Sequence, residues 1–171
     1  MRFDKFKKIY KSANKIVFST KDDKCYIFDG FTALKFGKEL KGKILENLGF
    51  AGCELDEFVI LKEDGNSRIE KNEKSDVYKY FEDVEVIPAK YTGLILDGKI
   101  KGSIFDAGEG LLKFNSNYID MAEQLTDGMD TYYDKKSKKV LFFYGEKIDV
   151  LILPARSNKE DSKYLNKNFI I

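Results

Sequence analysis

The side chains in this sequence whose type and spacing could do chemistry are three aspartates, Asp127, Asp130 and Asp134. Carboxylate oxygens bind Mg²⁺ and Ca²⁺, and intervals of three and four residues could bring the three side chains together. Residues 129–133, however, have the composition of a strand, which puts Asp130 and Asp134 on one face and leaves Asp127 in the preceding turn. The pattern therefore favours a cluster of turn aspartates over a magnesium site.

Other catalytic signatures are absent from the sequence. It has no histidine, so triads of the Ser-His-Asp or Cys-His kind are excluded. Gly108-Glu109-Gly110 is too short for a phosphate-binding loop, and a tight hairpin explains it. Cys25 and Cys53 lie far apart and in no metal-binding spacing, which predicts two free thiols. We therefore expect no enzymatic activity, no cofactor and no metal; an enzyme with a carboxylate site is the least favoured alternative.

Basic side chains near the N-terminus could contact phosphate groups. The candidates are Arg2, Lys5, Lys8, Lys11, Lys15, Lys38, Lys41 and Lys43. If the two helices predicted to carry them lie side by side, they would give weak, salt-sensitive and sequence-independent contact with double-stranded DNA. No recognition-helix pattern indicates base readout. The alternative for each lysine is an ordinary solvated position on an amphipathic helix.

The net charge of +1 hides a division along the chain. Residues 1–43 hold 12 Lys/Arg against 5 Asp/Glu, residues 44–134 hold 9 against 20, and residues 135–171 hold 9 against 4. This division allows contact with a polyanion on one face, or head-to-tail contact between copies of the chain. Solvated faces of a protein rich in lysine and glutamate are the alternative.

The composition predicts a folded, cytoplasmic protein without membrane contact. Of the 171 residues, 43% are hydrophobic and 14% aromatic, enough for one core or two small modules that share an interface. No apolar run approaches the length of a membrane span, and the first fifteen residues alternate Phe and Ile with Lys.

Hydrophobic periodicity predicts helices and strands that alternate along the chain. The expected helices cover residues 1–15, 38–48 and 118–125, with a short helix or turn at 77–81. The expected strands cover residues 16–20, 25–28, 31–36, 58–62, 67–71, 84–87, 92–96, 99–105, 110–114, 129–133, 140–144 and 148–153. Asn115 offers a helix N-cap, Gly49 a helix stop, and Asp29-Gly30 a hairpin turn.

Two stretches of similar sequence indicate an internal repeat. Residues 27–36 (IFDGFTALKF) are echoed by residues 104–114 (IFDAGEGLLKF), and a helix and further strands follow each. The predicted fold is α+β, with two similar small modules of antiparallel strands and two helices each, at 1–74 and 75–156, and a tail at 157–171. Chance similarity in a biased composition is the alternative.

Residues 115–156 resemble the C-terminal module of bacterial beta sliding clamps, the processivity subunits of DNA polymerase III. The matching features are a helix opened by Asn115-Ser116-Asn117-Tyr118-Ile119, a meander, and a closing strand of aliphatic residues that runs into Pro154 and Arg156. Residues 28–35 are similar to the Asp-Gly-containing strand pair of clamp N-terminal modules. Bacterial clamp subunits have three domains, whereas this chain is less than half as long and continues for 15 residues after the Pro-Arg motif.

The resemblance implies a clamp-like DNA-replication accessory protein of the kind encoded by phages or mobile elements. It would encircle or lie along DNA as a homo-oligomer and tether a polymerase or another protein through a short peptide. The peptide pocket of clamps, carried over to this sequence, would involve Leu153, Pro154, Ala155 and Arg156. An ordinary edge strand capped by proline is the alternative for these residues. The runner-up function is a small interaction or inhibitor module that binds a host protein without encircling DNA.

Overall fold

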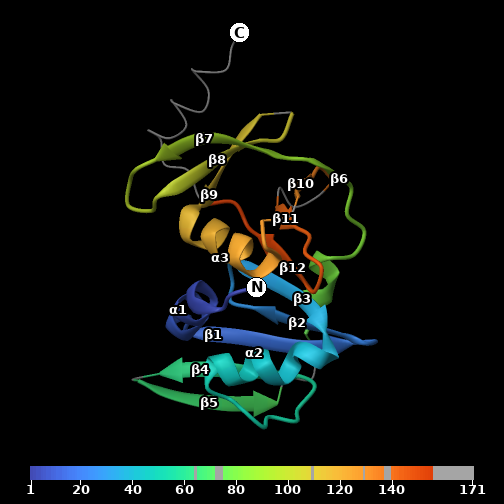
Figure 1. Ribbon diagram of the computed structural model, residues 1–171. Coiled ribbons are helices and arrows are strands. Elements are labelled where there is room, and N and C mark those ends of the chain that lie inside the picture. Colours follow the sequence, from blue (N-terminus) through green and yellow to red (C-terminus); the bar gives the residue numbers. More distant parts are fainter. Residues whose placement is uncertain (64, 72–74, 109, 129, 137–139, 156–171) are drawn as a thin grey trace.

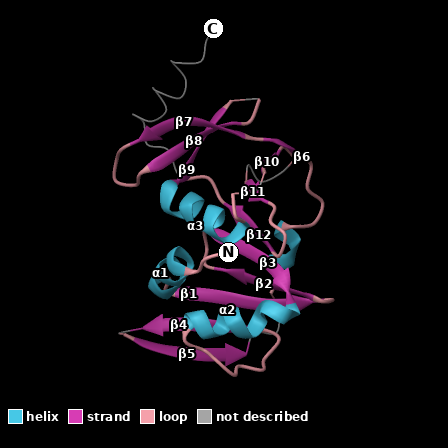
Figure 2. Ribbon diagram, viewed as in Figure 1, coloured by secondary structure: helices cyan, strands magenta, loops and turns pink. Residues whose placement is uncertain are grey.

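The computed structural model describes residues 1–63, 65–71, 75–108, 110–128, 130–136 and 140–155 (Figure 1). The helices are α1 (Asp4–Ser12), α2 (Lys41–Leu48) and α3 (Ser116–Thr126), with 3-10 turns η1 (Lys38–Leu40) and η2 (Val77–Tyr80). The strands are β1 (Lys15–Lys21), β2 (Lys24–Phe28), β3 (Thr32–Gly37), β4 (Phe58–Glu63), β5 (Asn66–Lys71), β6 (Val86–Pro88), β7 (Lys90–Leu96), β8 (Gly102–Asp106), β9 (Leu111–Asn115), β10 (Thr131–Asp134), β11 (Leu141–Phe143) and β12 (Ile148–Ile152). These antiparallel sheets and helices confirm the predicted α+β class (Figure 2).

The strands form two sheets. The larger has nine strands in the order β5-β4-β1-β2-β3-β12-β11-β10-β6, and the smaller is β7-β8-β9. In the larger sheet β3 and β12 lie side by side, with Leu34 opposite Val150 and Phe36 opposite Ile148. One sheet therefore runs through residues of both predicted modules, 1–74 and 75–156.

All three helices cover the same face of the nine-stranded sheet, which we call the helix face (Figure 1). Side chains alternate along a strand, so each strand gives every second residue to this face. The helices contribute Phe6, Tyr10, Ile44, Leu45, Leu48, Ile119, Met121, Ala122 and Leu125, and the strands contribute Ile16, Phe18, Cys25, Ile27, Leu34, Phe36, Phe58, Ile60, Ile148, Val150 and Ile152. These buried residues form the main core.

The opposite face of the sheet, which we call the aromatic face, carries a second apolar cluster. Its buried members are Tyr26, Ala33, Val77, Val140, Phe142 and Leu151. The chain between β5 and β6, the two outer strands of the sheet, includes η2 and packs Val77, Tyr78 and Phe81 against this face. The segment therefore connects opposite edges of the sheet across the aromatic face.

A helix followed by a three-stranded meander occurs twice in the chain. The first copy is α1 with β1, β2 and β3, and the second is α3 with β10, β11 and β12. The last strands of the two meanders pair with each other, and α1 packs against α3. The two similar stretches of sequence are not equivalent in this repeat. Residues 27–36 form β2 and β3 within the first copy, whereas residues 104–114 form β8 and β9 of the small sheet, which precede the second copy.

Local signals act as expected, and the differences lie at element ends. The Asn115 side chain accepts the Asn117 N–H at 3.0 Å and caps α3, while Gly49 ends α2 with a φ of 90°. α1 stops at Ser12 because Ala13 is extended, so Lys15 opens β1 and does not extend the helix. β8 begins at Gly102 and not at Lys99.

Candidate functional site

The eight candidate phosphate-contacting residues do not share one environment. α1 presents Lys8 and Lys11 to solvent, and neither forms an ion pair within the described ranges. Lys7, which the sequence reasoning omitted, is also exposed on this helix. Lys15 is exposed, but Ile16 faces the helices, so strand alternation directs Lys15 to the aromatic face.

Several of the other candidates are held by local contacts. Lys41 Nζ lies 3.2 Å from Asp56 Oδ1 and 2.9 Å from the Leu55 carbonyl oxygen. Lys38 Nζ lies 3.5 Å from Asp23, and Lys43 Nζ sits 5.1 Å from the centre of the Phe3 ring. The contacts of Lys41 depend on the loop before β4, that of Lys38 on the turn between β1 and β2, and that of Lys43 on the N-terminal segment beside α1. None of these leaves a local signal in the sequence.

The contact between the N-terminal segment with α1 and helix α3 occupies Lys5 and the N-terminal ammonium group, but not the exposed side chain of Arg2. Lys5 Nζ pairs with Asp120 at 3.1 Å, the N-terminal ammonium group pairs with Asp127 at 2.6 Å, and the Arg2 backbone N–H donates to the Gln124 carbonyl at 2.9 Å. Exposed Asp120 and Glu123 make α3 acidic beside the lysines of α1.

The structure does not bring the three predicted aspartates together. Asp127 binds the N-terminus, and exposed Asp130 precedes β10. Asp134 is buried, and its Oδ1 accepts backbone N–H groups of Glu85 and Lys136, both at 3.1 Å. In the part of the chain that the structure describes, no three His, Cys, Asp or Glu side chains could hold a metal ion. Cys25 and Cys53 are both free, as expected.

The predicted partner-peptide residues follow β12. The interpretation of an ordinary edge strand is wrong, because β12 lies between β3 and β11 near the middle of the large sheet. The Leu153 N–H donates to the Phe31 carbonyl at 2.9 Å and the Ala155 N–H to the Lys113 carbonyl at 2.9 Å, while Pro154 is exposed. Arg156 and the tail at 157–171 lie outside the described residues.

Leu153 packs against the apolar cluster of the aromatic face, which contains buried Phe142 and the half-buried rings of Phe28, Tyr80 and Tyr144. Phe28 and Tyr80 have ring centres 5.3 Å apart, and Phe142 and Tyr144 stack at 5.6 Å. The sequence reasoning did not single out these rings as a site. The sequence feature that could have indicated them is the alternation of aromatic residues along β2 and β11. The same alternation is equally typical of residues buried in a core.

The two stretches that carry the clamp resemblance meet at one end of the helix face. Asp29 Oδ1 accepts the N–H groups of Phe31 and Thr32 at 2.9 and 2.7 Å, and this turn holds Phe31 in solvent, 60% exposed. The Phe31 ring stacks on Tyr118 of α3 at 6.1 Å. Burial, followed by the charge of Asp29, raises the pKa of Tyr118 to about 12.

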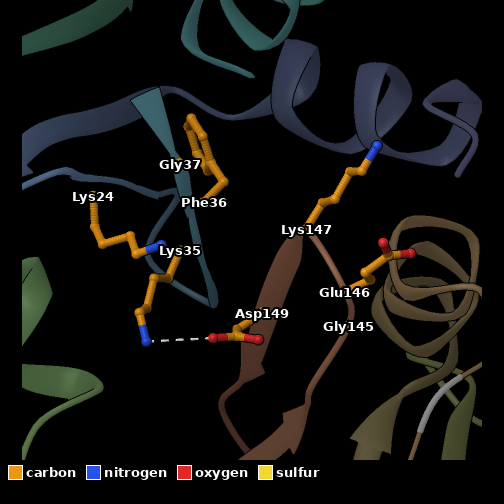
Figure 3. A pocket seen from close by; sticks show the side chains of 8 residues that line it. All are labelled: Lys24, Lys35, Phe36, Gly37, Gly145, Glu146, Lys147 and Asp149. Atoms are coloured by element: carbon orange, nitrogen blue, oxygen red, sulfur yellow. Dashed lines mark ion pairs between the residues drawn. The ribbon is translucent and has the colours of Figure 1, made fainter. Parts of the chain in front are cut away.

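A pocket of about 170 Å³ lies where β3 ends and β12 begins (Figure 3). Lys35 Nζ pairs with Asp149 at 3.4 Å across these two strands. Lys24 extends toward Lys35, but Lys147 extends away from the ion pair. The pocket thus has charges of both signs, and its cations do not converge on one point.

Comparisons with protein-family models, with curated proteins and with solved structures each find no match for this chain. The clamp resemblance therefore rests on the sequence motifs alone. Within the described ranges, no helix is both long enough and apolar enough to cross a membrane.

Proposed function

We propose that this chain is a non-enzymatic, clamp-like accessory protein of DNA replication, acting in the cytoplasm on double-stranded DNA and a protein partner. The observation that carries the proposal is the arrangement of three helices on one face of a continuous antiparallel sheet, with a repeated helix–meander unit whose last strands pair. We propose with it that the fold consists of two similar, clamp-like modules.

DNA would lie against α1. Exposed lysines on this helix can approach phosphate groups without gripping them, because long flexible side chains give weak, sequence-independent attraction. The acidic side chains of α3 limit the basic surface to the α1 side of the helix layer. Such a contact favours movement along DNA, with retention supplied by a homo-oligomer.

The partner would bind on the other side of the sheet. Leu153, which Pro154 and Ala155 follow, packs on the aromatic face, whereas Lys8 and Lys11 belong to the helix layer. A short peptide carrying apolar side chains suits half-buried rings such as Phe28 and Tyr80. Two separate surfaces would let the chain hold DNA and a polymerase, or another protein, at the same time.

The test is DNA affinity measured at several salt concentrations. The double variant Lys8→Glu/Lys11→Glu should weaken binding and reduce the slope of log K against log salt by about two, roughly one for each lost phosphate contact. The matched control, Lys71→Glu/Lys99→Glu, makes the same charge change on β5 and on the turn between β7 and β8. Equal losses in the two variants, or no salt-dependent binding by the parent, would contradict the DNA-facing role of α1.

A second function is favoured by the acidic face of α3. Asp120 and Glu123 are exposed beside α1, and Lys5 is already paired with Asp120, which reduces the basic area available to DNA. A small interaction or inhibitor module that binds a host protein accounts for such a mixed surface. A monomer without salt-dependent DNA affinity would favour this function.

A further inference from the structure

The small sheet buries side chains on both of its faces. Phe105 of β8 and Phe114 of β9 lie on one face and join α3 in the main core (Figure 1). Ile104 of β8 is also buried, at 1% exposure, but it belongs to neither of the two apolar clusters. Successive residues of a strand point to opposite faces. Ile104 therefore lies on the face turned away from α3, which we call the outer face.

The strand register identifies the other residues of the outer face. Ile104 lies opposite Lys113 of β9, and Leu96 of β7 lies opposite Gly102 on the same face. Leu111, two residues before Lys113, is half-buried there, as is Leu96. Lys113 is only 6% exposed, and its aliphatic carbons cross Gly102, where a Cβ would come within 2.2 Å of Lys113 Cε. Lysines at a surface usually carry the ammonium group into water, so this face has the burial of an interior surface.

The described part of the chain stops at the edge of the outer face. The Ala155 N–H donates to the Lys113 carbonyl at 2.9 Å, and β9 is an edge strand of the small sheet. Residues 156–168 separate Ala155 from Phe169, and when extended they could span about 40 Å. Three adjacent strands are together only about 10 Å across. The tail at 157–171 therefore starts beside the outer face and is long enough to cross all of it.

The sequence of the tail suits a cover for this face. Its polar and charged residues are interrupted by two apolar groups, Tyr164-Leu165 and Phe169-Ile170-Ile171. Leu96, Ile104 and Leu111 offer these groups an apolar surface, and apolar side chains that leave water together stabilise such a contact. The polar residues between the two groups can stay in water.

We propose that the tail folds back over the outer face of the small sheet in its own chain and covers Leu96, Ile104 and Leu111 with its five apolar side chains. Because the contact of Ala155 with β9 holds the start of the tail beside this face, the tail has a high effective concentration there. The small sheet is then a layer between α3 and the tail. This inference goes beyond the proposed function, since neither the lysines of α1 nor the rings of the aromatic face take part in it.

The test is the reactivity of single thiols toward dithiobis-nitrobenzoate. In a Cys53→Ser background, which leaves only buried Cys25, Ile104→Cys or Leu111→Cys places a reporter thiol on the outer face. Ending the chain at Arg156 should make either reporter react about tenfold faster or more, because thiol reactivity follows exposure. Ile69→Cys, on β5 of the large sheet, is the matched control and should react equally fast in both chain lengths. Equal rates for the outer-face reporters in the two lengths would overturn the proposal.

Changes within the tail test which of its residues form the cover. Replacing its five apolar residues by serine should accelerate the reporters as the truncation does, whereas alanine at three of its polar residues, Ser162, Asn166 and Asn168, should not. Protection should not depend on protein concentration, because the contact lies within one chain. Protection that appears only as concentration rises would overturn the proposal, since the tail of a second copy would then supply the cover. Circular dichroism checks that each variant is folded, and Leu111→Cys serves as the reporter if Ile104→Cys is not.

Discussion

Asp29 forms a local turn and is also buried by the packing of the fold. The sequence marks Asp29-Gly30 as a hairpin, and the structure adds that the carboxylate accepts two backbone N–H groups and the Thr32 hydroxyl. Burial raises the pKa of Asp29 from its ordinary value of 3.8, and its hydrogen bonds only partly oppose this effect. The folded protein therefore holds the Asp29 proton more tightly than the unfolded chain does.

We predict that Asp29→Asn gains stability relative to the parent as pH rises. Because the pKa of Asp29 is higher in the folded state, protonation favours folding, and this contribution is lost as pH increases from below 3.8 through the raised pKa. Asparagine keeps the acceptor oxygen and has no charge to desolvate. Urea unfolding at acidic and neutral pH measures the difference, with fully exposed Asp23→Asn as the control. A gain confined to low pH would contradict the prediction.

At the scale of elements, short-range signals predicted most of the structure. Asn115, Gly49 and the Asp29-Gly30 turn act within a few residues, so the sequence alone located α3, α2 and the β2–β3 hairpin. Contacts between residues that are far apart in the sequence have no local sequence pattern that predicts them. The contacts of Lys41 with Leu55 and Asp56 fall in this class, and they explain why a lysine predicted to face DNA is held locally.

The N-cap of α3 is testable at this scale. Asn115→Ala should lower the free energy of unfolding by about 1 kcal/mol, because the Asn117 N–H loses its acceptor. Asn115→Asp should keep most of the stability, since a carboxylate also caps and suits the helix N-terminus. Asn117→Ala, at an exposed position two residues along that keeps its backbone N–H, is the matched control. Thermal or urea unfolding gives the values, and equal losses at both positions would rule out the cap.

At the scale of the whole molecule, the main finding is that one sheet runs through both halves of the sequence. The pairing of β3 with β12 joins residues 32–37 to residues 148–152, and periodicity within either strand could not reveal it. Amphipathic patterns predicted which residues are buried. They carried no information on the order of strands, which the hydrogen bonds between distant segments decide.

Because the sheet is continuous, we predict that both halves of the chain unfold in one transition. Leu34→Ala in β3 and Ile148→Ala in β12 remove fully buried side chains from the shared core and should each cost about 2–5 kcal/mol. Both variants should shift a single transition, seen alike by circular dichroism and tyrosine fluorescence. Two separate transitions, each sensitive to one substitution, would indicate independent modules.

The central position of β12 also has a consequence for synthesis. β12 is the last described strand in the sequence, yet its place in the sheet is between β3 and β11. During translation, the N–H and C=O groups along one edge of β3 have no partner strand until more than a hundred further residues have been synthesised. Long-range pairing of this kind slows folding and leaves an unpaired strand exposed to aggregation. We therefore expect the nascent chain to be a better substrate for chaperones than its size alone would suggest.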